Sequence, residues 1–391
     1  MGVGAGIAAY KVCELLRRLT ESGHEVQVVP TRDALRFVGE PTWAALSGRP
    51  VSTEVWDEVA GVAHVRIGQH ADLVFVAPAT ADLMARAAHG LADDLLTNTL
   101  LTARCPVVFA PAMHTEMWEH PATQASVALL RSRGVIVIEP ASGRLTGEDT
   151  GRGRLPDPAE LFEVARRVLA GSPRDLAGRH VVVSAGGTRE PIDPVRFIGN
   201  RSSGLQGFAL ARSAVARGAK VTLVAANAAL PDPAGADVVR VGSAAELRIA
   251  MLAVAPTADV VVMAAAVADF RPVDRHESKM KKVDGEETLS IGLVKNPDIL
   301  AELVGRRTPG QVIVGFAAET DHVLEHGRAK LARKGCDLLV VNQVGENLTF
   351  GAPDNAAVIL SSSGGPALEV PRGPKEALAE AVWDQAVTRL I

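Results

Sequence analysis

Cysteine is scarce in this chain of 391 residues. Its three cysteines, Cys13, Cys105 and Cys336, lie far apart, outside any Cys-x-x-Cys pair or Cys/His cluster. This spacing argues against a disulfide framework and against a zinc site. The sequence also lacks an apolar run of the roughly 18 residues that a membrane-spanning helix needs, and it lacks a charged leader before an apolar core. We therefore expect a cytoplasmic protein with no membrane partner.

Strong net charge is absent as well. The formal net charge of −4 provides no global attraction to nucleic acid or to acidic membranes, so any anion must be bound by local groups. No GxxxxGK[ST] loop occurs, which excludes the usual P-loop for a triphosphate. With 47% hydrophobic and 22% charged residues, the composition is typical of a globular protein that buries large cores.

Short apolar runs alternate with helical patterns along the whole chain, which predicts α/β architecture with parallel sheets. We expect two successive Rossmann-like domains, 1–172 and 173–391, because the turn-rich residues 171–178 form the most natural boundary. The predicted strands of the first domain are residues 25–29, 73–77, 107–110 and 135–138. Those of the second are residues 180–184, 220–224, 259–263, 312–315, 337–341 and 357–360.

The first domain begins unusually. Residues 4–9, Gly-Ala-Gly-Ile-Ala-Ala, have the pattern of a turn between a first strand and a helix that runs to about Gly23, yet only three residues precede them. The sequence therefore predicts that the first strand is missing. The two explanations are a start that is too far downstream and a sheet that is incomplete; we favour the first because losing a central strand exposes paired edges.

The turn-rich residues 184–204, SAGGTREPIDPVRFIGNRSSG, follow a predicted strand. Glycine allows a backbone to approach a ligand closely, and proline fixes the path of the chain. Arg189, Arg196 and Arg201 carry forked donors that suit phosphate or carboxylate. The pattern favours an anion site, and the alternative is an ordinary connection with solvated arginines.

Lysine is rare but clustered. Six of the nine lysines, Lys279, Lys281, Lys282, Lys295, Lys330 and Lys334, fall within 56 residues. Lysine is a compact point charge that suits phosphate, so this cluster indicates a nucleoside triphosphate; a solvated basic loop is the alternative. Residues 264–270, 295–300 and 314–320 follow strands or begin a helix, where phosphate binds in open α/β sheets.

In order and spacing, these runs of residues 178–385 resemble phosphopantothenate-cysteine ligases, the carboxyl-terminal half of a bacterial bifunctional enzyme of coenzyme A synthesis. The resemblance implies that CTP and Mg²⁺ activate 4'-phosphopantothenate as an acyl-cytidylate, which L-cysteine converts to an amide. It implies catalytic roles for Lys279, Asn200 and Arg196, and a possible metal contact at Asp269. The implied CTP contacts are Ala264, Ala265, Asp269, Lys279, Pro297, Asp298, Ile299, Leu300, Phe316, Lys330 and Lys334.

The first domain carries Gly4-x-Gly6-x-x-Ala9, a weak dinucleotide fingerprint. NAD binding would require an acidic residue at the end of the next strand, where this chain has Val29-Pro30-Thr31. Threonine suits a phosphate oxygen, so FMN is favoured over NAD. A tight turn without a ligand and an NAD-dependent dehydrogenase are the alternatives.

Residues 76–82, 91–97 and 111–118 lie at or beyond predicted strand ends, and with the Gly4 turn they resemble flavoprotein decarboxylases that act on cysteinyl carboxylates. The resemblance covers residues 2–158, and Pro-Ala-Met-x-x-x-Met-Trp is its most specific part. It implies a flavodoxin-like FMN domain with His64 as catalytic base or carboxylate-orienting group. The implied cofactor contacts are Gly6, Thr31, Pro78, Ala79, Thr80, Thr97 and Met113.

The chain departs from this family at several positions. His114 and Asp82 stand where asparagine is usual, and we expect His114 to take over carboxylate binding. Gly147 stands where the flap usually supplies a proton-donating cysteine, which leaves His114, Glu148 or water as donors. In the second half, Leu205-Gln206 replaces a lysine found in some relatives.

Together the two resemblances predict an enzyme that joins phosphopantothenate to cysteine and then decarboxylates the product to phosphopantetheine. They also imply a homo-oligomer with trimeric flavin domains and dimeric ligase domains. The alternative is a ligase whose flavin-binding domain has lost catalysis and serves a regulatory role.

Overall fold

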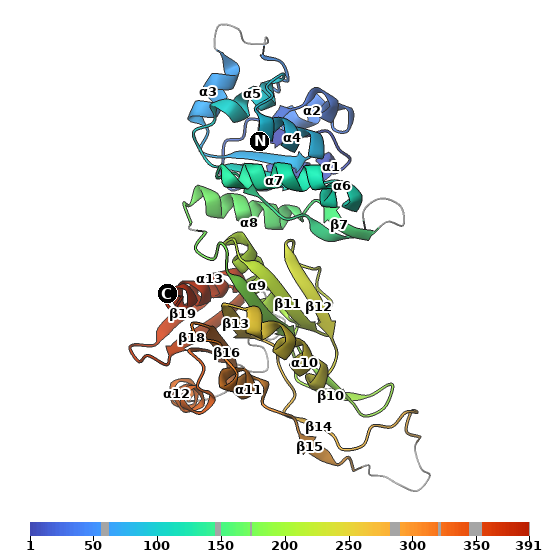
Figure 1. Ribbon diagram of the computed structural model, residues 1–391, viewed down its shortest axis with the longest axis vertical. Helices are drawn as coiled ribbons and strands as arrows, with labels where there is room; N and C mark the ends of the chain where they lie inside the picture. Colours follow the sequence, from blue (N-terminus) through green and yellow to red (C-terminus); the bar gives the residue numbers. More distant parts are fainter. Residues whose placement is uncertain are drawn as a thin grey trace. The chain divides into compact units, whose positions relative to one another are not determined.

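A computed structural model describes residues 1–55, 62–144, 150–172, 174–281, 290–319, 322–343 and 354–390. The chain divides into two compact units, Met1–Pro173 and Arg174–Ile391. Each unit is an α/β structure with its own sheet, as Figure 1 shows. In the described ranges, no helix combines the length and the apolarity that crossing a membrane requires.

The sheet of the first unit has five parallel strands in the order β2-β1-β3-β4-β5. The strands are β1 (Gly2–Val3), β2 (Val29–Pro30), β3 (Val74–Ala79), β4 (Val107–Pro111) and β5 (Ile136–Val137). Each coincides with or lies beside a predicted apolar run, apart from β1. A hairpin of β6 (Ala141–Arg144) and β7 (Thr150–Arg154) follows the sheet.

The prediction that the first strand is missing is wrong for this structure. Gly2–Val3 forms β1 in the centre of the sheet, paired with β2 on one side and β3 on the other. The backbone N–H of Val29 donates to the carbonyl of Met1 at 2.8 Å, and Val3 is completely buried.

Helices cover both faces of this sheet (Figure 1). The cluster of buried side chains on one face includes α1 (Ala9–Glu21), α2 (Glu40–Ser47) and α8 (Pro158–Leu169). The cluster on the other includes α3 (Ala63–His70), α4 (Ala81–His89), α5 (Leu95–Thr102), α6 (Thr115–Glu119) and α7 (Pro121–Ser132). The strands are apolar on both faces because each face packs against helices.

The sheet of the second unit has the order β12-β11-β8-β13-β16-β17-β18-β19. Its parallel strands are β8 (His180–Gly186), β11 (Lys220–Ala226), β12 (Ala236–Val241), β13 (Val260–Met263), β16 (Val312–Glu319) and β17 (Leu338–Gln343). At one edge, β18 (Asp354–Ser361) and β19 (Leu368–Pro374) are antiparallel. The parallel α/β class is as predicted, and the antiparallel edge is an addition.

Two helices, α9 (Leu205–Ala216) and α13 (Lys375–Val387), cover one face of this sheet. The other face packs against α10 (Ala244–Val254), α11 (Ile299–Gly305) and α12 (Val323–Lys334). Two antiparallel pairs stand apart from the sheet and form an arm: β9 (Arg189–Pro191) with β10 (Phe197–Gly199), and β14 (Phe270–Pro272) with β15 (Leu293–Lys295).

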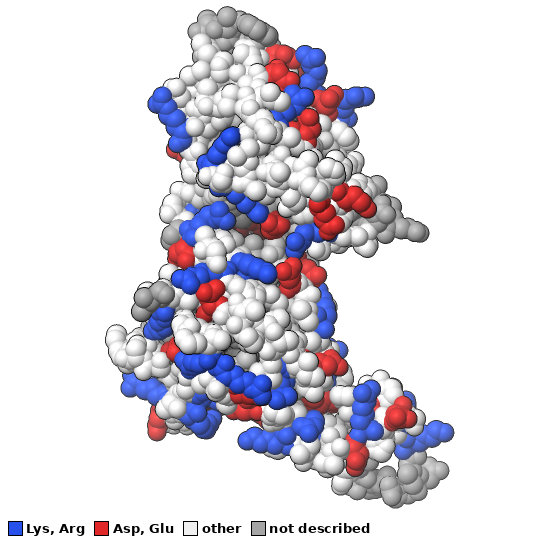
Figure 2. Space-filling view, viewed as in Figure 1, with Lys and Arg blue, Asp and Glu red and all other residues white. Residues whose placement is uncertain are grey.

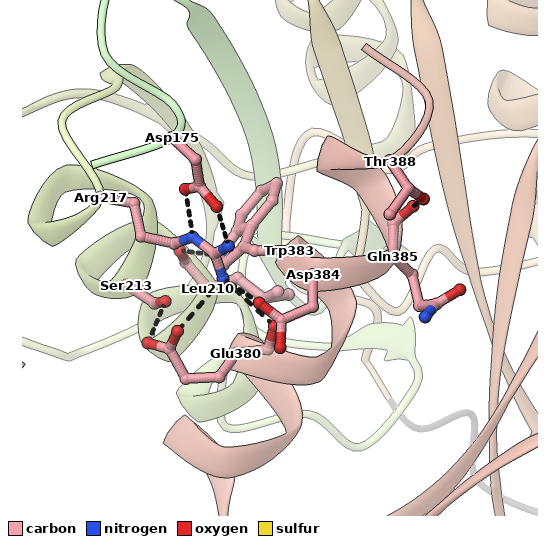
Figure 3. A network of polar contacts seen from close by, with 9 residues as sticks. All are labelled: Asp175, Leu210, Ser213, Arg217, Glu380, Trp383, Asp384, Gln385 and Thr388. Atoms are coloured by element: carbon pink, nitrogen blue, oxygen red, sulfur yellow. Dashed lines mark hydrogen bonds and ion pairs between the residues drawn. The ribbon is translucent and has the colours of Figure 1, made fainter. Parts of the chain in front are cut away.

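A buried arginine connects three segments of the second unit (Figure 3). The Arg217 side chain is 2% exposed and donates to Asp175 through Nε at 2.8 Å and to Asp384 through Nη1 at 2.8 Å. Glu380 accepts from Arg217 at 3.3 Å and from the Ser213 hydroxyl at 2.6 Å. These bonds fix the first residues of the unit and α13 to the end of α9, because a buried guanidinium requires partners for its donors.

Candidate functional site

The carboxyl ends of the strands define the candidate site in the first unit. Parallel strands end at the same edge, and ligands of open α/β sheets bind beyond it where the strand order reverses. Here the reversal lies between β1 and β3, as in flavodoxin-like sheets with the same strand order. The Gly4 turn follows β1, and Pro78–Thr80 lie at the end of β3, so the sheet brings two of the predicted segments together.

Gly4 lies against the main chain of the last residues of β3. Its N–H donates to the Pro78 carbonyl at 3.0 Å, and a Cβ at this position would lie 2.5 Å from that oxygen. Only glycine allows this approach. Gly6 is more open, with its nearest neighbour, Pro78 Cγ, 3.9 Å from an added Cβ. The turn leads into α1, whose first N–H groups suit an anion.

Two threonine hydroxyls lie near strand ends in the same unit. The Thr31 hydroxyl accepts from the Ala34 N–H at 3.3 Å, and the Thr80 hydroxyl accepts from the Leu83 N–H at 3.2 Å. Both side chains are half-buried and cap the helices that follow. A hydroxyl that accepts one bond keeps its O–H, which could donate to a phosphate oxygen. Pro78 and Ala79 are buried in β3 itself.

Thr97 has partners within the chain. Thr97 is 1% exposed, and its hydroxyl donates to Asp94 Oδ1 at 2.7 Å. The Asp94 side chain in turn accepts from the Thr97 N–H at 2.7 Å, which completes a capping box at the start of α5. Thr97 therefore shapes the start of α5, and its predicted cofactor contact stays a prediction.

The β6–β7 hairpin lies directly against Met113, His114 and Thr115. The Met113 N–H donates to the Gly153 carbonyl at 2.9 Å. A Cβ on Gly153 would lie 2.2 Å from the Met113 carbonyl oxygen, and one on Gly151 would lie 2.3 Å from Thr115 Oγ1. Half-buried His114 caps α6 beside this contact. Gly147 and Glu148 lie outside the described residues.

His64 lies in the first turn of α3, which contacts α5. Its carbonyl accepts from the Thr102 hydroxyl at 2.8 Å. Its Nδ1 atom is buried and has no hydrogen-bond partner within the described chain. A buried ring nitrogen without a partner is unusual and is compatible with a ligand at this position.

In the second unit, buried polar side chains hold the loop that contains Ala264, Ala265 and Asp269. The Ser184 hydroxyl accepts from the Ala265 N–H at 3.1 Å, and the Thr188 hydroxyl accepts from the Ala268 N–H at 3.0 Å. Asn296 Nδ2 donates to the Ala268 carbonyl at 2.8 Å. These three anchors were not among the predicted site residues, although Ser184 and Thr188 lie in the turn-rich residues 184–204 and Asn296 precedes Pro297.

Arg196 organises the segment that contains Lys279. Arg196 pairs with the Asp193 carboxylate at 2.6 Å and donates to the Met280 carbonyl at 2.9 Å. Burial alone would raise the pKa of Asp193, but hydrogen bonds from Arg196 and from the N–H groups of Val195, Arg196 and Met280 outweigh it and hold the pKa well below its usual value. Lys279 itself is exposed next to this anchor.

Asn200 joins the turn-rich segment to the same loop. Its Nδ2 donates to the Val267 carbonyl at 3.0 Å. A Cβ on Gly187 would lie 2.9 Å from the Asn200 carbonyl oxygen, so glycine permits the close approach of these segments. Arg196 and Asn200, which are four residues apart, thus bind two distant segments: Arg196 the residue after Lys279, and Asn200 the loop at Val267.

The two lysines of α12 already face carboxylates. Lys330 Nζ lies 3.4 Å from Glu319 Oε1, and Lys334 donates to Asp298. Burial would raise the pKa of Asp298, but hydrogen bonds from Lys334 and the Ala301 N–H lower it. Both lysines are half-buried, so each could exchange its carboxylate partner for a phosphate without large movement.

The other predicted nucleotide contacts differ in exposure. Ala264, Ala265, Leu300 and Phe316 are half-buried, whereas Pro297, Asp298 and Asp269 are exposed. Ile299 is 3% exposed and packs into the core, which leaves only its main chain for a ligand. Within the described ranges, no group of three His, Cys, Asp or Glu side chains is arranged to hold a metal ion.

Family comparisons divide the chain in the same way as the structure. Residues 1–169 match the Flavoprotein family, and residues 176–390 match the DNA/pantothenate metabolism flavoprotein C-terminal domain. The two matches cover nearly the whole chain and meet close to the boundary between the structural units. The chain therefore combines a flavoprotein domain with a pantothenate-metabolism domain.

Curated relatives share this organisation. The coenzyme A biosynthesis bifunctional protein CoaBC of Mycobacterium tuberculosis is 58% identical over 100% of this chain and 96% of its own length. The CoaBC protein of Mycolicibacterium smegmatis is 60% identical over 93% of this chain and 91% of its own. A solved C-terminal domain of CoaBC is 34% identical over 56% of this chain and 98% of that domain, with a TM-score of 0.47. This chain belongs to the family of bifunctional coenzyme A biosynthesis proteins, which confirms the predicted family and the predicted fold.

Proposed function

We propose that this chain catalyses two consecutive steps of coenzyme A synthesis: it joins 4'-phosphopantothenate to L-cysteine and decarboxylates the product to 4'-phosphopantetheine. The observation that carries this proposal is the full-length similarity to bifunctional relatives, with one family match in each structural unit. The predicted site of the second unit supplies cations for a nucleotide, and that of the first unit supplies a glycine turn, hydroxyls and histidines for a flavin and its substrate.

In the ligase, the substrate carboxylate would attack the α-phosphate of CTP, releasing pyrophosphate and forming an acyl-cytidylate. Cysteine's amino group would then attack the acyl carbon and release CMP. Lys279 would neutralise charge in these steps, while Arg196 and Asn200 position the loops around the acyl group. Lys330 and Lys334 would hold phosphates, and the main chain at Pro297–Leu300 would contact the nucleotide.

Magnesium would accompany the triphosphate. Mg²⁺ in nucleotide sites is usually held by one or two carboxylates together with phosphate oxygens. The exposed carboxylate of Asp269 fits this pattern, since its loop is anchored by Thr188 and Asn296 while its side chain remains accessible. A metal held mainly by phosphates needs no preformed cluster of protein ligands.

In the first unit, the Gly4 turn at the start of α1 and the Thr31 and Thr80 hydroxyls would bind the phosphate of FMN, and Gly4 keeps this turn close to the Pro78 carbonyl. Bound FMN would accept and return the electron pair that the decarboxylation requires. His64 would orient the substrate carboxylate or accept a proton through the unpartnered Nδ1. His114 would contact the substrate beside the hairpin. We also propose that Gly6, Pro78, Ala79, Thr97 and Met113 line the cofactor site.

We further propose dimers of the ligase unit and trimers of the flavin unit. The arm of the second unit exposes large apolar side chains: Val195 at 61%, Phe197 at 51%, Phe270 at 49% and Val273 at 60%. In the first unit, Ile7 is 69% and Tyr10 is 60% exposed. Such groups favour protein contacts. On the face that Figure 2 shows, both units carry acidic as well as basic side chains.

A second candidate function follows from the flap sequence, which has no cysteine. In this alternative the ligase is active, and the flavin domain binds its cofactor without catalysing decarboxylation. Product analysis separates the two. Purified protein would be incubated with phosphopantothenate, cysteine, CTP, Mg²⁺ and FMN, and the products identified by mass spectrometry.

Phosphopantetheine with CMP and pyrophosphate is the expected result. Accumulation of phosphopantothenoylcysteine without carbon dioxide release would support the regulatory alternative. Failure to form CMP would contradict the ligase assignment.

A further inference from the structure

A buried side-chain amide whose oxygen has no hydrogen-bond partner in the described chain lies at the end of β17 in the second unit. Asn342 of β17 is 8% exposed, and its Oδ1 atom is buried without a hydrogen-bond partner in the part of the chain that the structure describes. Nearly all buried polar groups in proteins are paired, so an unpaired one requires an explanation.

Other buried amides of this unit are paired. Gln311 Nε2 donates to the carbonyls of Ala255 and Ala258 at 2.7 and 2.8 Å. The side-chain oxygens of Asn296 and Asn355 also have partners: Asn296 Oδ1 accepts from Arg271 Nη1 at 3.0 Å, and Asn355 Oδ1 accepts from the Ala356 N–H at 3.0 Å. Asn342 therefore differs from amides that serve the fold alone.

The sheet register places Asn342 on the face covered by α9 and α13. Asn342 is the register partner of Ala318 on β16 and of Ala357 on β18. Val340, two residues earlier on β17, packs into the cluster on that face, and side chains two apart in a strand share a face. The half-buried ring of Phe316, two residues before Ala318, packs against the same cluster. The amide and the aromatic ring thus occupy one face at the carboxyl edge, where ligands bind.

An amide and an aromatic ring are the groups that proteins use for nucleobases, because the ring packs on the flat face and the amide pairs with the edge. Cytosine presents an amino donor beside a ring-nitrogen acceptor. Rotation about χ2 lets Asn342 offer its oxygen or its nitrogen to such an edge. Building on the proposed ligase function, we propose that Asn342 hydrogen-bonds the cytosine edge of CTP next to Phe316 and is a specificity-determining residue.

The structure supplies a matched pair of variants. Asn342→Leu removes a buried oxygen that has no partner in the described chain, so we expect the fold to keep its thermal stability. Gln311→Leu removes two buried hydrogen bonds at the opposite end of β16 and should lower stability without changing nucleotide affinity.

A third variant tests base selectivity. Asn342→Asp keeps the shape of the side chain and accepts hydrogen bonds only, which suits the amino group of cytosine and repels the carbonyl of uracil.

Isothermal titration calorimetry with Mg-CTP and Mg-UTP on the full-length chain tests the inference, together with KM values and melting temperatures. We expect Asn342→Leu to weaken CTP binding about tenfold, the scale of one neutral hydrogen bond. The KM for phosphopantothenate should stay unchanged. The ratio of CTP to UTP affinity should be higher in Asn342→Asp than in Asn342→Leu.

Unchanged CTP affinity in Asn342→Leu would overturn the inference. A rise only in the phosphopantothenate KM would assign the amide to that substrate's own amide group and also overturn it. Wild-type protein that binds Mg-CTP but forms no phosphopantothenoylcysteine would contradict the ligase proposal while leaving the binding comparison valid. Wild-type protein that binds no CTP would remove both proposals.

Discussion

Arg196 and Asp193 form a two-point ion pair, with Nε and Nη2 of the arginine both donating to Asp193 Oδ2 at 2.9 and 2.6 Å. The same carboxylate oxygen accepts from the Met280 N–H at 3.2 Å. The pair therefore links the turn-rich residues 184–204 to Met280, the residue that follows Lys279. This linkage explains how an arginine could affect chemistry at a lysine that is distant in the sequence.

The depressed pKa of Asp193 predicts how its contribution to stability depends on pH. A carboxyl whose folded-state pKa lies below its ordinary value of 3.8 stabilises the fold fully above that value and loses the contribution as the pH falls further. We expect Asp193→Asn to melt at a lower temperature than the wild type at pH 7. Below pH 4 the difference should shrink. A difference that is constant from pH 7 to pH 3 would contradict this account.

Lys279→Gln should abolish phosphopantothenoylcysteine formation while leaving the fold intact, because the exposed Lys279 has no structural partner to lose in the described structure. Coupled measurement of CMP and pyrophosphate would show whether the block falls before or after acyl-cytidylate formation. Lys281→Gln, which changes a neighbouring exposed lysine, is the matched control. Wild-type amide yield from Lys279→Gln would remove this lysine from the mechanism.

Arg217→Met should destabilise the second unit by about 3 kcal/mol, because it leaves Asp175 and Glu380 without their buried cation. Arg212→Met, which removes the more exposed pair with Glu376, should cost less than about 1 kcal/mol. Urea unfolding of both variants measures the two free energies. Equal losses would mean that burial of Arg217 does not determine its contribution.

Gly4→Ala should reduce FMN affinity at least tenfold, since a methyl group would lie 2.5 Å from the Pro78 carbonyl oxygen and displace the turn. Gly39→Ala is the control, because an added Cβ there has its nearest neighbour at 3.6 Å. Fluorescence titration of flavin gives both affinities. Retention of wild-type affinity in Gly4→Ala would place the FMN phosphate elsewhere.

Burial raises the pKa of the Cys336 thiol to about 11 from an ordinary value of 9.0. Its thiolate fraction at pH 8 is therefore about a hundredfold smaller than in the unfolded chain. Iodoacetamide should label Cys336 correspondingly slowly in the native protein and rapidly in urea, as measured by peptide mass spectrometry. Equal labelling rates would show that the thiol is accessible.

The residue pattern correctly predicted the α/β class, most of the parallel strands and the family. Apolar runs such as residues 180–184 and 312–315 predict buried strands because both faces of a covered parallel sheet exclude water. The motifs around Asn200, Lys279 and Lys330 likewise indicate phosphate chemistry by residue type alone.

Which of these residues contact one another could be read from the folded chain alone. It placed Gly2–Val3 in the centre of the first sheet, where two partner strands supply the bonds that a two-residue run cannot supply itself. It also assigned Thr97 to a helix cap and left Asn342 unpaired. Whether a polar group finds a partner depends on the strand register and on segments that are distant in the chain. Neither can be read from the residues next to it in the sequence.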